Sequence, residues 1–176
     1  MKVKTLRKRL MIAISLGAVL LGVTAYIGVA SYGVTAMATQ ASGVTVSPLA
    51  PLAQFGEIKS KAKSGDWEAE IETKGVSDLH VVEVTIQPGG TLGWHSHLGP
   101  SFVIVKSGTA TFYMGDDPTC TPHVLPTGSS LFEPAGDVHT VRNESTTEPL
   151  VNVVVQLIPT GTPRLIRELS PGNCPF

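Results

Sequence analysis

Residues 93–101 read GWHSHLGPS, and the strand-like run SFVIVK continues from residue 101 to residue 106. Side chains alternate between the two faces of a β-strand, so His95 and His97 are expected on the same face. Two imidazoles on one face are two preset metal ligands. Among the remaining histidines, His139 is the best placed third ligand, because it follows the turn-like stretch EPAGDV and begins a strand-like run. The stretch therefore predicts a three-histidine site within a β fold.

The chain beyond residue 58 consists of short runs rich in β-branched residues, separated by Gly, Pro and Asp turn signals. No sustained helical period of apolar residues occurs there. This pattern is typical of an antiparallel sandwich or barrel, so an all-β fold is expected. The predicted strands are 67–73, 80–86, 101–106, 109–114, 137–143 and 150–158.

Two stretches resemble the two motifs of the cupin superfamily. Residues 89–108, GGTLGWHSHLGPSFVIVKSG, resemble the first motif, and residues 128–143, GSSLFEPAGDVHTVRN, resemble the second. The matching positions are Gly89, His95, His97, Gly108, Gly128, Pro134, Gly136, His139 and Asn143. The resemblance extends over roughly 60–160 and implies a small double-stranded β-helix, or jelly-roll barrel, with the metal held inside by the motif histidines. It also implies that a homodimer is to be expected.

The sequence departs from the family pattern at one metal-ligand position, where Ser101 stands in place of a glutamate. Three imidazoles still suit a divalent transition metal such as Fe, Mn, Zn, Ni or Cu. Some cupins work with three histidines, notably dioxygenases that oxidise thiols or cleave diketones. Ser101 is interpreted as a barrel-lining residue, with contact to a bound ligand or water as the alternative. Glu133 could replace the missing carboxylate, but its place before Pro134 in a turn favours a surface role.

The first 38 residues form a separate segment. Five of the chain's 13 Lys and Arg residues lie in the first nine positions, and the uncharged run 10–30 is long enough to cross a bilayer. Residues 36–38, Ala-Met-Ala, offer a signal-peptide cleavage site, so an uncut membrane anchor and a cleaved signal both stay open. Either outcome places the rest of the chain outside the cytoplasm.

After residue 38 the chain holds eight basic and fourteen acidic residues, and no Lys/Arg cluster that would neutralise phosphates. Nucleic acid is therefore not an expected partner. Residues 39–58 are rich in Ala, Ser and Pro and are interpreted as a linker, with room for a short edge strand near its end. A barrel domain with a C-terminal tail is expected over 59–176.

Cys120 and Cys174 both lie in the part expected to be exported, and a disulfide between them is predicted because exported compartments are oxidising. The alternative is a pair of separate thiols.

Three functions are compatible with the sequence. The first is a metal-dependent oxygenase, or less favourably an isomerase, that acts on a small organic molecule. The second is a non-catalytic module that binds a small molecule or a metal outside the cytoplasm. The third is a structural barrel without a metal. Because this fold hosts many activities, only the geometry of the site can separate them.

Overall fold

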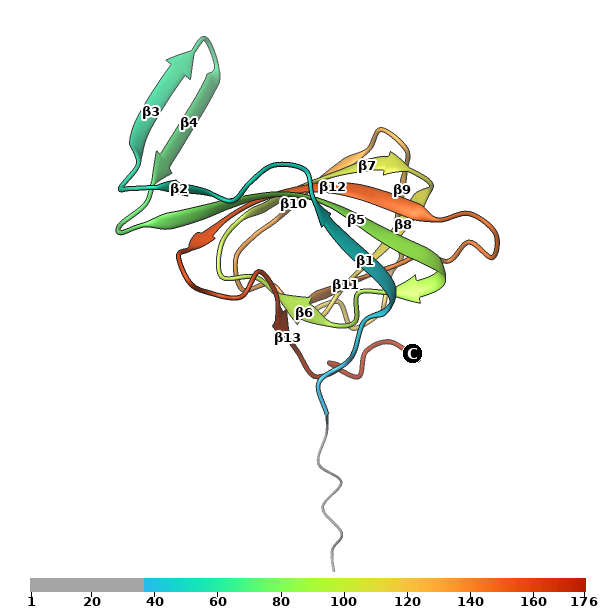
Figure 1. The fold of residues 1–176 in the computed structure, drawn as a ribbon. Coiled ribbons are helices and arrows are strands. Elements are labelled where there is room, and N and C mark those ends of the chain that lie inside the picture. The colour runs from blue at the N-terminus through green and yellow to red at the C-terminus, as the bar shows by residue number, and fades with distance from the viewer. Residues whose placement is uncertain (1–36) are drawn as a thin grey trace, which may run out of the picture. The chain divides into compact units, whose positions relative to one another are not determined.

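The computed structural model describes residues 37–176, and this part of the chain consists of strands and loops without a helix (Figure 1). The strands are β1 (Ser42–Pro48), β2 (Ala53–Phe55), β3 (Lys59–Ser64), β4 (Trp67–Glu72), β5 (Ser77–Thr91), β6 (His95–Ser96), β7 (Ser101–Ser107), β8 (Thr109–Met114), β9 (His123–Pro126), β10 (Ser130–Glu133), β11 (His139–Arg142), β12 (Leu150–Pro159) and β13 (Ile166–Arg167). The expected all-β architecture is confirmed for these residues. The apolar run 10–30 lies outside them, and within 37–176 no helix has the length and apolar character to span a membrane.

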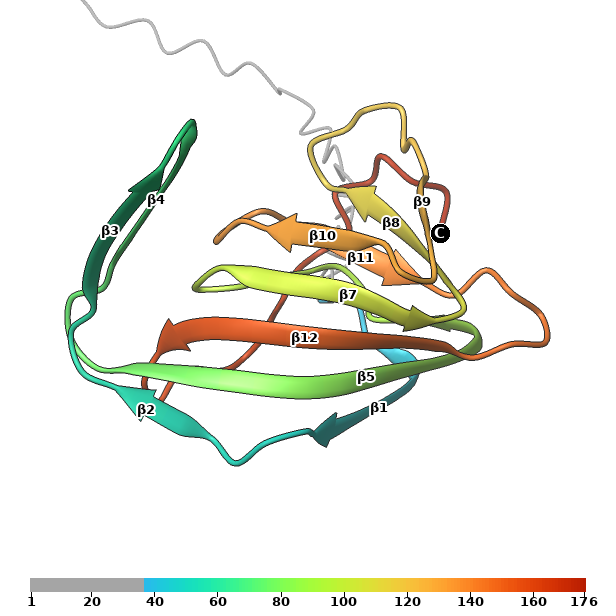
Figure 2. The same ribbon diagram turned by 90° about the horizontal axis from the view of Figure 1, so that it is seen from above.

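Eleven strands form one antiparallel sheet that curls into a nearly closed barrel (Figures 1 and 2). The long strand β5 organises this sheet, since it pairs with β12 along ten residues and with β1 and β2 as well. Strand β7 continues the sheet from β12, and β10 lies beyond β7. On the other side of the barrel, β11 pairs with β6 and β8. Each of the six strands expected from the sequence is present.

Within the predicted linker 39–58, residues 53–55 form the short strand β2 near its end, and residues 42–48 form β1, a strand of the barrel sheet that was not expected. The stretch GVTV within β1 carries two β-branched valines, and its backbone satisfies its hydrogen bonds on the edge of β5. Val44 and Val46 both reach the barrel interior. The flanking residues are rich in Pro and Ala, a composition typical of linkers, so the sequence pattern did not indicate this short strand.

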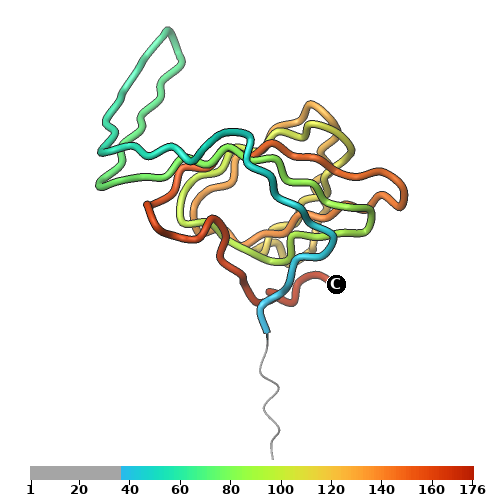
Figure 3. Tube along the Cα trace, viewed as in Figure 1, coloured from blue at the N-terminus to red at the C-terminus, as the bar shows by residue number. Residues whose placement is uncertain are grey.

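Strands β3 and β4 form a two-stranded hairpin of their own that projects from the barrel (Figures 1 and 3). The hairpin pairs a lysine-bearing strand with a glutamate-bearing strand, and Lys61 contacts both Glu68, at 2.8 Å, and Glu70, at 3.5 Å. Both partners are well exposed, so these ion pairs contribute little stability. The strand predicted over 67–73 is therefore confirmed, although it lies outside the barrel.

The barrel core follows the alternation of the strands. In β7, Ser101, Val103 and Val105 are buried, whereas Phe102 and Ile104 between them are exposed. The buried apolar residues that pack inside the barrel are Val82, Val84, Ile86, Val103, Val105, Ala110, Phe112, Val141, Leu150 and Val154. This valine-rich interior sets the apolar environment of the site described below.

The C-terminal tail is fastened to the barrel by the disulfide between Cys120 and Cys174, whose Cα atoms lie 5.2 Å apart. The predicted disulfide is thus present in the structure. Cys174 packs against Trp94, and the ring of Phe176 stacks on the same tryptophan. Trp94 is only 2 % exposed because the tail covers it. The tail therefore supports the strand segment that carries His95.

We expect replacement of Cys120 and Cys174 by serine to destabilise the protein. The bond closes a loop with a sequence separation of 54 residues, and the chain-entropy model assigns about 4 kcal/mol to a loop of that size. Urea unfolding of the oxidised protein and of the double variant measures the difference. Equal free energies of unfolding would contradict the structural role of the bond.

Candidate metal centre

Three histidines that are distant in sequence come together inside the barrel. His95 lies in β6, His97 follows that strand, and His139 begins β11 directly opposite His95 in the strand register. All three are buried, with exposed fractions of 1 %, 5 % and 1 %. One nitrogen of each lies within 4.8 Å of those of the other two. The structure therefore brings together the three residues that the sequence singled out.

The Nδ1 atom of each of these rings contacts a backbone carbonyl group. His95 Nδ1 lies 2.8 Å from Gly93 O, His97 Nδ1 lies 2.9 Å from Arg164 O, and His139 Nδ1 lies 2.9 Å from Asp137 O. When each Nδ1–H donates to its carbonyl, the proton sits on Nδ1 and the lone pair is on Nε2. Metal-binding histidines typically have this second hydrogen bond, which fixes the tautomer and the ring orientation.

A carboxylate that sequence reasoning placed on the surface lies beside these nitrogens. Glu133, at the end of β10, is only 5 % exposed, so the expected surface role was wrong. Its Oε2 is 3.2 Å from His97 Nε2 and its Oε1 is 3.4 Å from His139 Nε2. Neither nitrogen has a hydrogen-bond partner. Two buried acceptor nitrogens thus face a carboxylate, an arrangement that a bound cation satisfies and that is otherwise costly.

The position of Glu133 explains the missing glutamate of the first motif. Strands β10 and β7 are antiparallel neighbours, and their register pairs Glu133 directly with Ser101. Residues opposite each other on adjacent strands point to the same face of a sheet. The carboxylate therefore enters the barrel interior one strand away from the position where the family motif has it.

Ser101 itself is fully buried and does not line the cavity beside the histidines. The side-chain amide of Gln156 lies 2.9 Å from Ser101 Oγ and 2.7 Å from His97 Nδ1, and with its oxygen on this side it accepts from both groups. Ser101 is thus a packing residue of the barrel wall that braces the surroundings of His97 through Gln156.

The protonation states of Glu133 and His95 favour the binding of a cation. Burial would raise the pKa of the Glu133 carboxyl, but protonated His139 and His97 imidazoles beside it lower the pKa to about 2. The carboxylate is thus stabilised by positive charge on this side, which a metal ion supplies when the Nε2 atoms carry lone pairs. Burial, reinforced by the nearby His139, lowers the pKa of His95 to about 3. At neutral pH the carboxylate is therefore charged and the His95 imidazole is neutral, as metal ligation requires.

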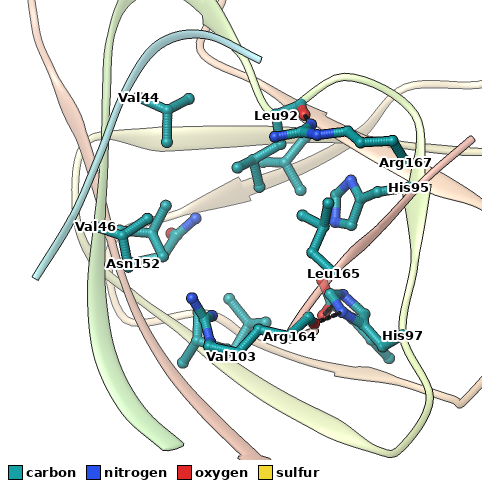
Figure 4. Close-up of a pocket in the computed structure, with 14 residues that line it drawn as sticks. Val44, Val46, Leu92, His95, His97, Val103, Asn152, Arg164, Leu165 and Arg167 are labelled. Carbon is teal, nitrogen blue, oxygen red and sulfur yellow. Dashed lines mark hydrogen bonds and ion pairs between the residues drawn. The ribbon is translucent and has the colours of Figure 1, made fainter. Parts of the chain in front are cut away.

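A cavity of about 200 Å³ lies against this group. Figure 4 shows His95 and His97 on one side of it, Val44, Val46 and Asn152 on the other, and the side chains of Arg164 and Arg167 reaching across. Its wall is mainly apolar, and the apolar residues are Val44, Val46, Val84, Leu92, Val103, Val141, Val154 and Leu165. A small organic molecule in this space would lie next to the histidines.

The other two histidines lie outside the group. His80 is half-buried on β5, and His123 is exposed at the start of β9. Asn143 is buried, donates to the carbonyl groups of Ile86 and Glu148, and accepts from the Ser145 N–H, so it fixes a turn.

The family comparison agrees with this geometry, because residues 82–156 match the family model of the cupin domain. The match covers less than half of the chain, so the chain is similar to cupin domains over these residues. No curated protein matches the chain.

Solved structures also resemble the chain. The polyketide cyclase RemF from Streptomyces resistomycificus has a TM-score of 0.50 and 14 % identity, over 76 % of this chain and 82 % of the cyclase. A cupin-like protein from Thermotoga maritima has a TM-score of 0.45 and 24 % identity, over 52 % of this chain and 65 % of that one. The lyase DddQ from Ruegeria pomeroyi, described as a DMSP lyase, has a TM-score of 0.42 and 24 % identity, over 48 % of this chain and 41 % of the lyase. The likeness to the cyclase shows the fold alone.

Three charged residues that line the cavity, Glu133, Arg164 and Arg167, were not predicted from the sequence. Glu133 was considered but dismissed, and the signal that identifies it is strand register: a residue paired with Ser101 shares its face. Arg164 follows β12 in the stretch TGTPR, where a turn and a proline favour a surface loop. No local pattern indicates that this segment closes over the cavity.

We expect Glu133→Gln to weaken metal binding about 10- to 100-fold, the range found when groups supporting a metal site are removed. The amide keeps the shape of the side chain but lacks the charge. Competition with a chelator of known affinity measures the change. Glu144→Gln, which neutralises a half-exposed carboxylate away from the cavity, is the matched control.

A second variant, chosen from the strand register, should restore the metal affinity that Glu133→Gln loses. In the double variant Ser101→Glu, Glu133→Gln the carboxylate returns to the position of the family motif, and the affinity should recover at least in part. Unchanged affinity in Glu133→Gln would show that the carboxylate does not contribute to binding.

Proposed function

We propose that this chain is a metal-dependent cupin in which His95, His97 and His139, together with Glu133, hold one divalent transition metal. The observation that carries the proposal is the group of buried Nε2 atoms without hydrogen-bond partners, facing a charged carboxylate. Neutral imidazoles with one carboxylate suit Fe(II), Mn, Ni, Cu or Zn. With four protein ligands, an ion that prefers six retains positions for other molecules.

The proposed ligand is a small organic molecule in the valine-lined cavity. A bound metal would act as a Lewis acid or a redox centre for that molecule. The chain's own residues provide the environment: the valines exclude water, and the charge of Glu133 partly offsets that of the ion. The backbone carbonyls at residues 93, 137 and 164 hold the rings in place.

The reaction we propose is an oxygenation, since imidazole and carboxylate ligands with open positions are typical of non-haem iron oxygenases. An isomerase is the less favoured enzyme. A non-catalytic binding module is the second candidate, and one observation favours it. Apart from the proposed metal ligands, the titratable residues that line the cavity in the described part of the chain are arginines, which are poor proton donors and acceptors near neutral pH.

We also propose that the domain works outside the cytoplasm. The disulfide supports this location, because such bonds persist in oxidising compartments. The basic N-terminus and the apolar run 10–30 support export with either membrane attachment or release.

Metal analysis tests the proposal. Protein loaded with each metal in turn and then desalted should retain about one ion per chain for at least one metal. The variant His95→Ala, His97→Ala should retain less than about a tenth of that amount, because two of the ligands are gone. His123→Ala, which removes an exposed histidine, should retain the full amount. A wild-type protein that retains no metal would refute the proposal.

Oxygen consumption separates the two candidate functions. The loaded protein is incubated with thiols, diketones and phenols in an oxygen-electrode cell, and the metal-free histidine variant is the control. Oxygen uptake that depends on both metal and substrate supports the oxygenase. Substrate binding without uptake supports the binding module.

A homodimer is proposed on the basis of an exposed aromatic pair on the outer face of the barrel. Phe102 on β7 and Phe132 on β10 are 55 % and 51 % exposed, and their ring centroids lie 5.1 Å apart near the edge of the sheet. Replacing both with serine should convert a dimer into a monomer in light-scattering measurements. Val124→Ser, at an equally exposed position on β9, should leave the dimer intact. A monomeric wild-type protein would overturn this part of the proposal.

A further inference from the structure

Arg164 carries a partly buried charge that has no ion-pair partner within residues 37–176. It lies between β12 and β13, lines the cavity, and has a buried Nε atom without a hydrogen-bond partner. Glu133 is near enough to raise its pKa, against the stronger lowering by burial. The close contacts of that carboxylate, however, are with His97 and His139.

The other arginines of the barrel domain, Arg142 and Arg167, each have a side-chain interaction within residues 37–176, although only Arg142 has a counter-charge. Arg142 pairs with Glu144 at 2.7 Å, and Arg167 donates to the carbonyl group of Leu92. A guanidinium stays charged at neutral pH, and leaving such a charge partly buried without a partner is costly. The cavity wall therefore contains an arginine without a counter-charge. This indicates that an anion from outside the chain pairs with its guanidinium.

The charges around the cavity have the same implication. Two arginines and one glutamate line it, so the lining is positive even before a metal adds its own charge. Asn152 adds a neutral amide to the wall and cannot balance that excess. Arginine recognises carboxylates well, because its planar donors match their two oxygens.

Size and polarity define the rest of the ligand. The cavity measures about 200 Å³ and most of its wall is apolar. An apolar cavity of about 150 Å³ is enough for benzene. A molecule with a single ring or a short branched chain and one charged group fits this space.

From these observations we infer that the cupin cavity binds a small organic carboxylate, with its apolar body against the valines and its carboxylate on the Arg164 guanidinium. This inference names the ligand class of the proposed metal site and rests on that proposal.

The backbone and the side chain of Arg164 have separable roles. The carbonyl oxygen accepts from His97 Nδ1 and orients a metal ligand, whereas the guanidinium faces the cavity. Arg164→Gln removes the charge and keeps the carbonyl. We therefore expect this variant to hold as much metal as the wild type while losing its preference for carboxylates.

Calorimetry on the full chain, loaded with the metal it retains best, tests the inference with paired probes. Each pair contains a carboxylate and its neutral amide: acetate with acetamide, 3-methylbutanoate with 3-methylbutanamide, and benzoate with benzamide. At least one carboxylate should bind the wild type at least 10-fold more tightly than its amide, as a charge-assisted contact requires. Arg164→Gln should reduce that ratio to about one. Lys106→Gln, which removes an exposed positive charge, should leave it unchanged.

The outcomes separate this inference from the proposed function. If no carboxylate is preferred over its amide by the wild type, the inference fails, and the metal content of the same sample reports independently on the metal site. If Arg164→Gln retains the preference and only metal removal abolishes it, the metal rather than Arg164 binds the anion, which also overturns the inference.

Discussion

The site depends on three hydrogen bonds from histidine Nδ1 atoms to backbone carbonyl groups. Two of them are local: His95 and His139 each contact the carbonyl two residues earlier, at Gly93 and Asp137. The third is long-range, because His97 contacts Arg164, 67 residues away. With the protons on Nδ1, the Nε2 lone pairs of His97 and His139 face the Glu133 carboxylate. A cation between them removes the cost of buried acceptors without partners.

The barrel provides the conditions under which these contacts matter. Its valine interior desolvates the imidazoles, which is the main reason that the pKa of His95 falls to about 3. The disulfide and Phe176 hold the tail over Trp94, next to His95. Strand β1 adds Val44 and Val46 to the cavity wall. The stability of the fold and the chemistry of the site therefore rely on the same packed interior.

Residues with a local signature were predictable from the sequence. The His-x-His pair, the turn before His139 and the alternating runs were sufficient for an all-β fold and a three-histidine group. Glu133 was not, because its burial follows from the pairing of β10 with β7, and register is a property of two strands. Arg164 was missed for a similar reason, since it depends on how the segment after β12 returns to the barrel. Strand β1 was not predicted because pairing with β5, rather than its own composition, holds it in the sheet.

The carboxylate shift from position 101 to position 133 changes the interpretation of the sequence. A serine at the motif position suggested a metal site without a carboxylate ligand, and therefore favoured a binding module over an enzyme. Glu133 supplies that carboxylate from the neighbouring strand.

Anomalous diffraction from a metal-loaded crystal, recorded at the absorption edge of the bound metal, tests the proposed metal site most directly. We expect one peak, and it should lie between the Nε2 atoms of His95, His97 and His139 and a carboxylate oxygen of Glu133. A peak elsewhere, or none at this position in fully loaded protein, would contradict it.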